Sequence, residues 1–434
     1  MAAPFALRAL TWIKAAAPPP RHTCAMDMPR EPNPSLSPRL LARAPHRLMF
    51  FIGASNLLLA MAWWAAWLAS TRWHWFVIPQ PDPYAGWLHA FVMQYQVLPS
   101  FFFGFLLTTF PRWMGLPELA RWRYLPVGIG MFGGQLATLL GAFGWSGGML
   151  VGAVLTLLGW CAGLAALGPL LLREQGTTWH ARSCFAALCL GLLGLLAWLA
   201  LLLGASPLFA FASIKIGTFG LLLPVFVTVA HRMFPFFAGN VVAGYKPWRP
   251  LWLLGLCWAL TLAHLALELV HGYRWLWAPD LGLLALSTTL LWRWWPRGSR
   301  NGLLVTLFIG LAWLPIAFAL YALQSVAYLE TGVFRLGRAP AHAMFIGVFA
   351  SILVAMVTRV TQGHSGRPLK MPAVAWFAFV AIQLVAILRI VAELAPDPMA
   401  WMAIAAFGWL LAFTPWVLRI GRIYLSPRAD GKPG

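Results

Sequence analysis

The sequence predicts an all-α integral membrane protein, a polytopic bundle of about twelve transmembrane helices with both termini in the cytoplasm. The first observation is composition: of 434 residues, 61% are hydrophobic and only 10% are charged, too few for the surface of a soluble protein of this size. The second is spacing. A bilayer core about 30 Å thick needs about 20 apolar residues per helix, and such segments recur along the whole chain.

We expect transmembrane helices near residues 48–69, 88–110, 124–144, 147–172, 184–204, 207–231, 250–270, 275–293, 302–322, 341–358, 373–394 and 399–420. The predicted domains are a disordered, basic, Pro-rich cytoplasmic tail (1–47), a membrane domain (48–422) and a short cytoplasmic tail (423–434).

The net charge of +20 follows the predicted topology. With the N-terminus inside, the inner segments hold 25 Lys and Arg residues and the outer loops hold 4, while Lys215 and Arg389 fall within spans. This alternation is the positive-inside rule, and it indicates an even number of helices. The basic residues therefore indicate topology and attraction to anionic lipid rather than nucleic-acid binding.

Histidines and one acid gather at the outer ends of the predicted helices. Because ionisable groups within spans are costly, they indicate function. His264, Glu268 and His271 stand at i, i+4 and i+7, so they share one helix face. A carboxylate in this position can orient an imidazole that binds a metal. The outer group comprises His89, His264, Glu268, His271 and His342.

A second group faces the cytoplasm, and two cations lie within spans. The inner group comprises His46, His231 and His364, with Arg359 and Arg367 beside the last of these; His74 and His180 lie in loops and receive no role. Lys215 and Arg389 lie toward the outer side, where they call for an anion. Glu268 would neutralise one of them, whereas the carboxylates of a bound ligand would neutralise both.

Proline and glycine shape the spans. Pro99, Pro224 and Pro315 lie within predicted helices, where they produce kinks that aim side chains around a cavity. Many glycines in the third and fourth spans permit close helix approach. No GxGxxG, Walker, HExxH or GxSxG motif occurs in a context that would indicate an enzyme.

Four stretches resemble one family in the same order along the chain. They are PHRLMFFIGA, which opens the first helix, GFLLTTFPRWMG, the RMFPFFAGN that follows His231, and HAMFIGVFASILVAMVTRVTQGHSGRP, which starts at His342. Between residues 45 and 368 the chain resembles the NnrS family. The resemblance implies a bacterial inner-membrane protein that binds haem and copper and takes part in the nitric oxide response and in protection from nitrosative stress.

The resemblance also implies roles for single residues. His89 and Met93 match the first and last positions of the family's His-x-His-Glu-Met stretch, while Phe91 and Val92 replace its second histidine and its glutamate. His342, Arg359, His364, Gly366 and Arg367 match the last block, and His231 with Arg232 matches the basic position before Pro-Phe-Phe.

These matches lead to an expected arrangement of cofactors. The axial imidazoles of the haem are expected to be drawn from among His89, His264 and His342. Its propionates are expected near Lys215 and Arg389. The residues expected at a further metal, such as copper, are His46, His231, His364, His271, Glu268 and Met93. The expected partners are nitric oxide or a related small ligand, the bilayer and an unspecified electron-transfer partner.

Three other classes of function stay open. A multi-pass transporter fits the helix count, although the sequence has no clear internal repeat and no paired broken helices. A terminal oxidase or nitric oxide reductase would need more histidines within the spans, and a purely structural scaffold would leave the two histidine groups unexplained. Within the leading interpretation, sensing, protection and slow catalysis are alternatives.

Overall fold

The structure, a computed structural model, describes residues 36–432, and within this range it contains helices and no strand. Of the tail predicted to be disordered (1–47), residues 1–35 lie outside the described residues, whereas residues 36–47 contain a short helix, Pro38–Arg43, and the start of the first long helix at Pro45. The elements in chain order are η1 (Pro38–Arg43), α1 (Pro45–Trp73), α2 (Ala85–Phe91), η2 (Val92–Val97), α3 (Leu98–Trp113), α4 (Arg121–Ala142), α5 (Gly148–Arg173), α6 (Trp179–Leu202), α7 (Leu208–Lys215), η3 (Ile216–Leu222), α8 (Leu223–Gly239), α9 (Leu251–Leu269), η4 (Tyr273–Trp275), α10 (Trp277–Trp294), α11 (Gly302–Thr331), α12 (Ala339–His342), η5 (Ala343–Ala350), α13 (Ser351–His364), α14 (Ala373–Val391) and α15 (Pro398–Tyr424).

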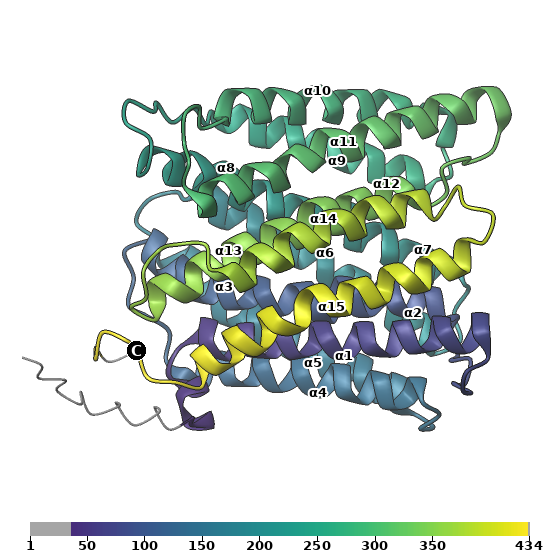
Figure 1. The fold of residues 1–434 in the computed structure, drawn as a ribbon, viewed down its shortest axis with the longest axis horizontal. Coiled ribbons are helices and arrows are strands. Elements are labelled where there is room, and N and C mark those ends of the chain that lie inside the picture. Colours follow the sequence, from purple (N-terminus) through teal and green to yellow (C-terminus); the bar gives the residue numbers. More distant parts are fainter. Residues whose placement is uncertain (1–35, 433–434) are drawn as a thin grey trace, which may run out of the picture. The chain divides into compact units, whose positions relative to one another are not determined.

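The predicted polytopic helical bundle is confirmed. Within residues 36–432, eleven helices are long and apolar enough to cross a membrane, counting α2–η2–α3, α7–η3–α8 and α12–η5–α13 as one helix each. The remaining predicted span, 275–293, corresponds to α10, which has 18 residues and carries Asp280 and Arg293, so its mean hydropathy is lower. It nevertheless lies alongside the other helices (Figure 1).

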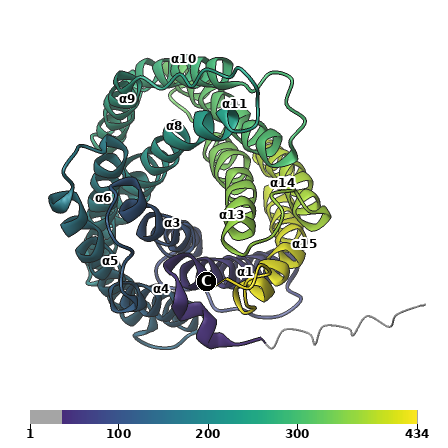
Figure 2. The ribbon, with the colours of Figure 1, turned by 90° about the vertical axis from the view of Figure 1, so that its left-hand side faces the viewer.

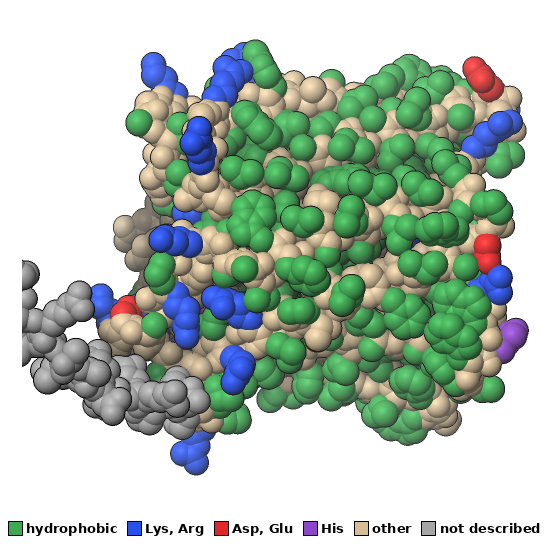
Figure 3. Space-filling model, viewed as in Figure 1, with side chains coloured by type: hydrophobic (Ala, Val, Ile, Leu, Met, Phe, Trp, Pro, Cys, Tyr) green, Lys and Arg blue, Asp and Glu red, His purple; other side chains and the backbone are tan. Residues whose placement is uncertain are grey.

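The helices run side by side along one direction and form a ring around three central helices (Figures 1 and 2). Viewed along this direction, α3, α8 and α13 lie inside, surrounded by α1, α4, α5, α6, α9, α10, α11, α14 and α15. Lys and Arg side chains gather at the end that carries the start of α1 and the end of α15 (Figure 3). We call this the basic end and the other the opposite end.

The three central helices are the most buried. Of the most apolar stretch of each, 83% (residues 85–113), 67% (208–239) and 83% (339–364) is buried, against 33–61% for the other spanning helices. Each contains a π-helical segment, namely η2, η3 and η5. Pro99 and Pro224 follow directly after η2 and η3. Because proline has no N–H, the preceding turn loses an α-helical hydrogen bond, which favours the wider π turn.

These central helices also define a repeat that the sequence does not show. Each is the second helix in a group of four, so the bundle comprises three four-helix groups that each contribute one π-containing helix to the centre. The sequence itself shows no clear internal repeat, and the recurrence lies in the order of the helices. Each π segment continues into α-helix on both sides, so none of the three central helices is broken.

Glycine contacts fix the closest helix pair. Gly130 of α4 faces Gly159 of α5, and a Cβ on Gly130 would lie 2.4 Å from the Cα of Gly159. A Cβ on Gly134 would likewise lie 2.3 Å from Oγ1 of Thr156. The predicted close approach of the third and fourth spans is thus confirmed, and only glycine permits it at these positions.

Candidate functional site

A large cavity lies among the central helices toward the opposite end. It encloses about 1490 Å³ of free space, including its opening, and its walls come from α1, α14, α15 and all three central helices. A basic side chain stands within three residues before each π segment, and all three line this cavity: His89, Lys215 and His342. π-Helical turns occur frequently at functional sites, since they displace side chains from regular helical positions.

His89 is held by an aromatic wall. Its ring stacks on Trp64 of α1 with a centroid separation of 4.4 Å and an angle of 10° between the planes. Its buried Nδ1 has no hydrogen-bond partner. A buried polar atom without a partner is costly, so this nitrogen points to a ligand or a solvent molecule at the site.

His342 is oriented by its own helix. Its Nδ1 lies 2.9 Å from the carbonyl oxygen of Arg338, so Nδ1–H donates to that oxygen. The neutral ring then carries its lone pair on Nε2. A histidine fixed in this way, with one nitrogen donating to a backbone carbonyl, has the usual geometry of a metal-binding imidazole.

Cations surround the mouth of this cavity, and two of them are paired with acids. Lys215 Nζ lies 2.7 Å from Glu268 Oε1, and an Arg389 amino group lies 2.7 Å from Glu393 Oε1. Glu268 therefore neutralises Lys215, as one of the two sequence-based alternatives states. Nη1 of Arg389 is buried without a partner, and Arg338 is an exposed third cation on the same wall.

His264 and Glu268 lie in a second, polar cavity of about 820 Å³, which meets the first at Lys215. His264 is fully buried, and its Nδ1 lies 2.7 Å from Asp280 Oδ1. Its Nε2 lies 3.6 Å from Glu268 Oε1 and has no hydrogen-bond partner. His264 is thus enclosed by two carboxylates and contributes no atom to the lining of the cavity that holds His89 and His342.

His271 lies apart from both cavities. It follows the end of α9 with a left-handed backbone (φ 56°), is exposed, and its Nδ1 lies 2.6 Å from the hydroxyl of Tyr273. The predicted outer group is therefore divided: His89 and His342 share one cavity, His264 and Glu268 share another, and His271 is at the surface.

The inner group is divided as well. His46 and His364 lie together at the basic end, with ring centroids 4.1 Å apart. His231 instead lies with Nδ1 2.9 Å from Nε2 of His180 and Nε2 3.2 Å from the Pro250 carbonyl oxygen. Within residues 36–432, no three His, Cys, Asp or Glu side chains converge to hold a metal ion.

The two predicted arginines lie near these histidines in sequence but have different surroundings. The guanidinium of Arg359 stacks 4.0 Å from the ring centroid of Phe237, whereas Nη1 of Arg367 is buried without a partner. Met93 lines the large cavity, and Pro99 shapes the helix below it.

Sequence reasoning missed four residues that the structure places at these sites: His180, Asp280, Arg338 and Glu393. Asp280 carried a signal, because it is an acid within a predicted span and such groups indicate function. His180 and Arg338 stood in predicted loops, and their roles arise from contacts with distant segments.

The fold and the cavities define a polytopic helical membrane protein with an imidazole-lined interior. A sequence profile described as "NnrS protein" matches residues 40–428, nearly the whole described chain. The chain belongs to the NnrS family, as the resemblance predicted. A search of curated proteins finds no match.

Proposed function

We propose that this chain is a haem-binding membrane protein of the nitric oxide response, with haem held in the large cavity by His89 and His342. The observation that carries the proposal is that these two histidines, from two different central helices, line one cavity with nitrogens free for a ligand. Neutral imidazole nitrogen is a common axial ligand of haem iron.

The cavity fits a haem in size and chemistry. Its free space of about 1490 Å³, including its opening, exceeds the ~300–1,000 Å³ common for small-molecule sites, so it leaves room for a ligand as large as a haem. Most of its wall is apolar, from Leu57, Phe345, Ile346 and Trp409, and an apolar wall suits a porphyrin face. The side chains of His89 and His342 are only half-buried although their helices are central, because they border this cavity.

The cations at the mouth fit the carboxylates of such a ligand. Arg338 and the unpartnered Nη1 of Arg389 are available donors, and Arg389 keeps Glu393 on its other side. Arginine binds carboxylates through paired, charge-assisted hydrogen bonds. Lys215 is already engaged by Glu268, so its share in binding propionates is smaller than that of the arginines.

Bound haem would supply an iron that takes nitric oxide as a ligand. The chain's own residues orient the imidazoles, balance the carboxylate charge and keep bulk water from an apolar wall. Thioether and aromatic side chains such as Met61, Met93 and Trp64 line this wall. Sensing and protection both fit this arrangement, since each needs a nitric oxide site without a further catalytic group.

The proposal of a copper site rests on fewer observations than the proposal of a haem site. His46 and His364 bring two imidazoles together at the basic end, and the buried Nδ1 of His46 has no partner. We propose that a bound copper ion lies at this pair of imidazoles. Any further ligand would come from groups other than these two histidines. The location proposed for the protein is the bacterial inner membrane, with the basic end in the cytoplasm, because the predicted inner segments hold 25 of the 31 Lys and Arg residues.

An optical spectrum of the purified protein, oxidised and reduced, with metal analysis of the same sample tests the proposal. We expect a haem band that shifts on reduction and again with nitric oxide, and near-stoichiometric iron. His89→Ala and His342→Ala should each lower haem content severalfold or change the spectrum. The matched control is His74→Asn, an exposed histidine whose left-handed backbone asparagine tolerates.

Two results would overturn the proposal. A colourless protein without iron from haem-sufficient cells would direct attention to transport. Unchanged haem content and spectrum in both histidine variants would place the haem elsewhere.

A further inference from the structure

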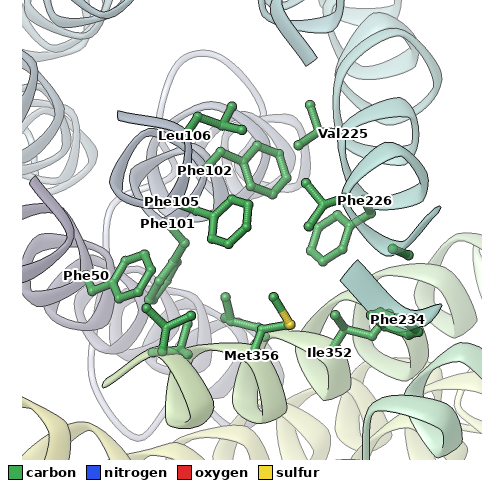
Figure 4. Close-up of a pocket in the computed structure, with 15 residues that line it drawn as sticks. Phe50, Phe101, Phe102, Phe105, Leu106, Val225, Phe226, Phe234, Ile352 and Met356 are labelled. Carbon is green, nitrogen blue, oxygen red and sulfur yellow. The ribbon is translucent and has the colours of Figure 1, made fainter. Parts of the chain in front are cut away.

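A second interior space lies between the same three helices, nearer the basic end. It holds about 570 Å³ of free space, including its opening, and all fifteen side chains that line it are apolar (Figure 4). Phe101, Phe102 and Phe105 approach from α3, Val225 and Phe226 from α8, and Met356 from α13.

The three central helices contribute equivalent positions to the lining of this space. Each central helix contributes the same i, i+1, i+4, i+5 face: 101, 102, 105 and 106 on α3; 225, 226, 229 and 230 on α8; 352, 353, 356 and 357 on α13. Such residues lie on one side of a helix, so the three helices turn matching faces toward a common axis. The apolar space is therefore built by equivalent faces of the three central helices.

This apolar space adjoins the large cavity. Leu353 belongs to the lining of both. An apolar void of this kind stays dry and takes up small apolar molecules, since water would find no hydrogen-bond partner in it. Its narrow, aromatic walls favour a compact guest over an extended chain.

We propose that this space, bounded by Phe102, Val225, Phe226, Ile352, Leu353 and Met356, is a docking site for a small apolar gas, from which the gas passes Leu353 into the large cavity. The class of ligand is an uncharged diatomic gas, which dissolves in the bilayer core. The proposal rests on the proposed function only for its second half, the passage to a haem.

Xenon is the probe for the site itself, because it is apolar, compact and independent of haem. The full chain in lipid nanodiscs is equilibrated with hyperpolarised ¹²⁹Xe, with empty nanodiscs as the blank. We expect a protein-bound resonance distinct from lipid-dissolved xenon. Val225→Phe, which fills the space, should abolish it, and Val380→Phe, the same change at an exposed position of α14, should leave it intact.

One further variant keeps the test decisive. If Val225→Phe fails to fold, Ala230→Val adds two methyl groups at another lining position and should weaken xenon binding severalfold. Absence of a bound resonance in the unsubstituted protein, or its persistence in a folded filling variant, would overturn the proposal.

Passage to the large cavity is tested separately on haem-loaded protein. After photodissociation of nitric oxide, Val225→Phe should raise the fraction that rebinds before escape at least twofold, because the gas loses its docking site. Bound xenon without haem would leave the gas site standing and refute the proposed haem function. Haem without bound xenon would refute only the gas site.

Discussion

The two halves of the central three-helix axis differ in chemistry although the same helices build both. Toward the opposite end, the π segments and the residues before them present imidazoles and cations to the large cavity, with a polar cavity beside it. Toward the basic end, regular helix follows Pro99 and Pro224, and the axis is lined by apolar side chains alone. The change from π to α winding therefore coincides with the change from ligand chemistry to packing.

This difference predicts how each half responds to substitution. In the polar half, stability depends on pairing, because a buried charge without its partner is far more costly than the pair. In the apolar half, it depends on volume, and the existing free space limits what a small truncation removes. The predictions test this contrast from its largest effect to its smallest.

The largest effect is expected at the Lys215–Glu268 pair, where the large cavity meets the polar cavity. Glu268→Gln leaves the Lys215 ammonium, 2.7 Å away and mostly buried, without a carboxylate. We expect a loss of about 3 kcal/mol, since removing one partner of a buried pair strands the other charge. Reversible unfolding in mixed detergent micelles measures it.

A double variant provides the control. Lys215→Met combined with Glu268→Leu removes both charges and keeps most of the volume, so it should regain most of the stability lost by Glu268→Gln. If the double variant is as unstable as the single one, packing rather than charge governs this half, and the contrast fails.

The positions of the helices and the grouping of residues at each membrane face could be predicted from the sequence. Span positions follow from apolar length, so the predicted helices agree with the structure within a few residues at most ends. Positions at the two membrane faces follow from topology, and this brought His89 and His342 into one group. Glu268 was expected to neutralise one of the two cations within spans, Lys215 or Arg389, because all three lie toward the outer side, and the structure pairs it with Lys215.

Partners between distant segments could not be predicted. His264 is enclosed by Asp280 because α9 and α10 pack as a hairpin, and His231 contacts His180 because α6 packs against α8. The π segments were also hidden: η5 contains no proline, and its sequence reads as an ordinary apolar helix. These features depend on tertiary packing, which a single sequence does not encode in local patterns.

A smaller effect is expected in the apolar half. Ile352→Val removes one methylene from the wall of a space that is already open, so we expect a loss of about 1 kcal/mol. The same substitution at Ile316, which is 46% exposed on α11, is the matched control and should have almost no effect. A loss at Ile352 equal to that of Glu268→Gln would contradict the contrast between the halves.

The smallest effect is expected at an ion pair outside the interior. At the opposite end, an Arg72 amino group at the end of α1 lies 2.6 Å from Asp397 Oδ2 before α15, and both side chains are well exposed. The hydrogen bond from Arg72 lowers the pKa of Asp397, which lies outside the spanning helices. Exposed pairs of this kind contribute little, because water and salt screen them.

The depressed pKa sets the direction of its pH dependence. The pair stabilises the fold above the unfolded-state pKa of Asp397, and this contribution is lost as pH falls through the lower folded-state value. Asp397→Asn removes the charge while its side-chain oxygen can still accept from the Ala400 N–H at the start of α15. We expect its melting temperature to match that of the unsubstituted protein at neutral pH within error, and at low pH as well. A shift comparable to that of Glu268→Gln would mean that burial does not govern the strength of ion pairs here, because this pair has the better geometry of the two and differs mainly in its exposure to water.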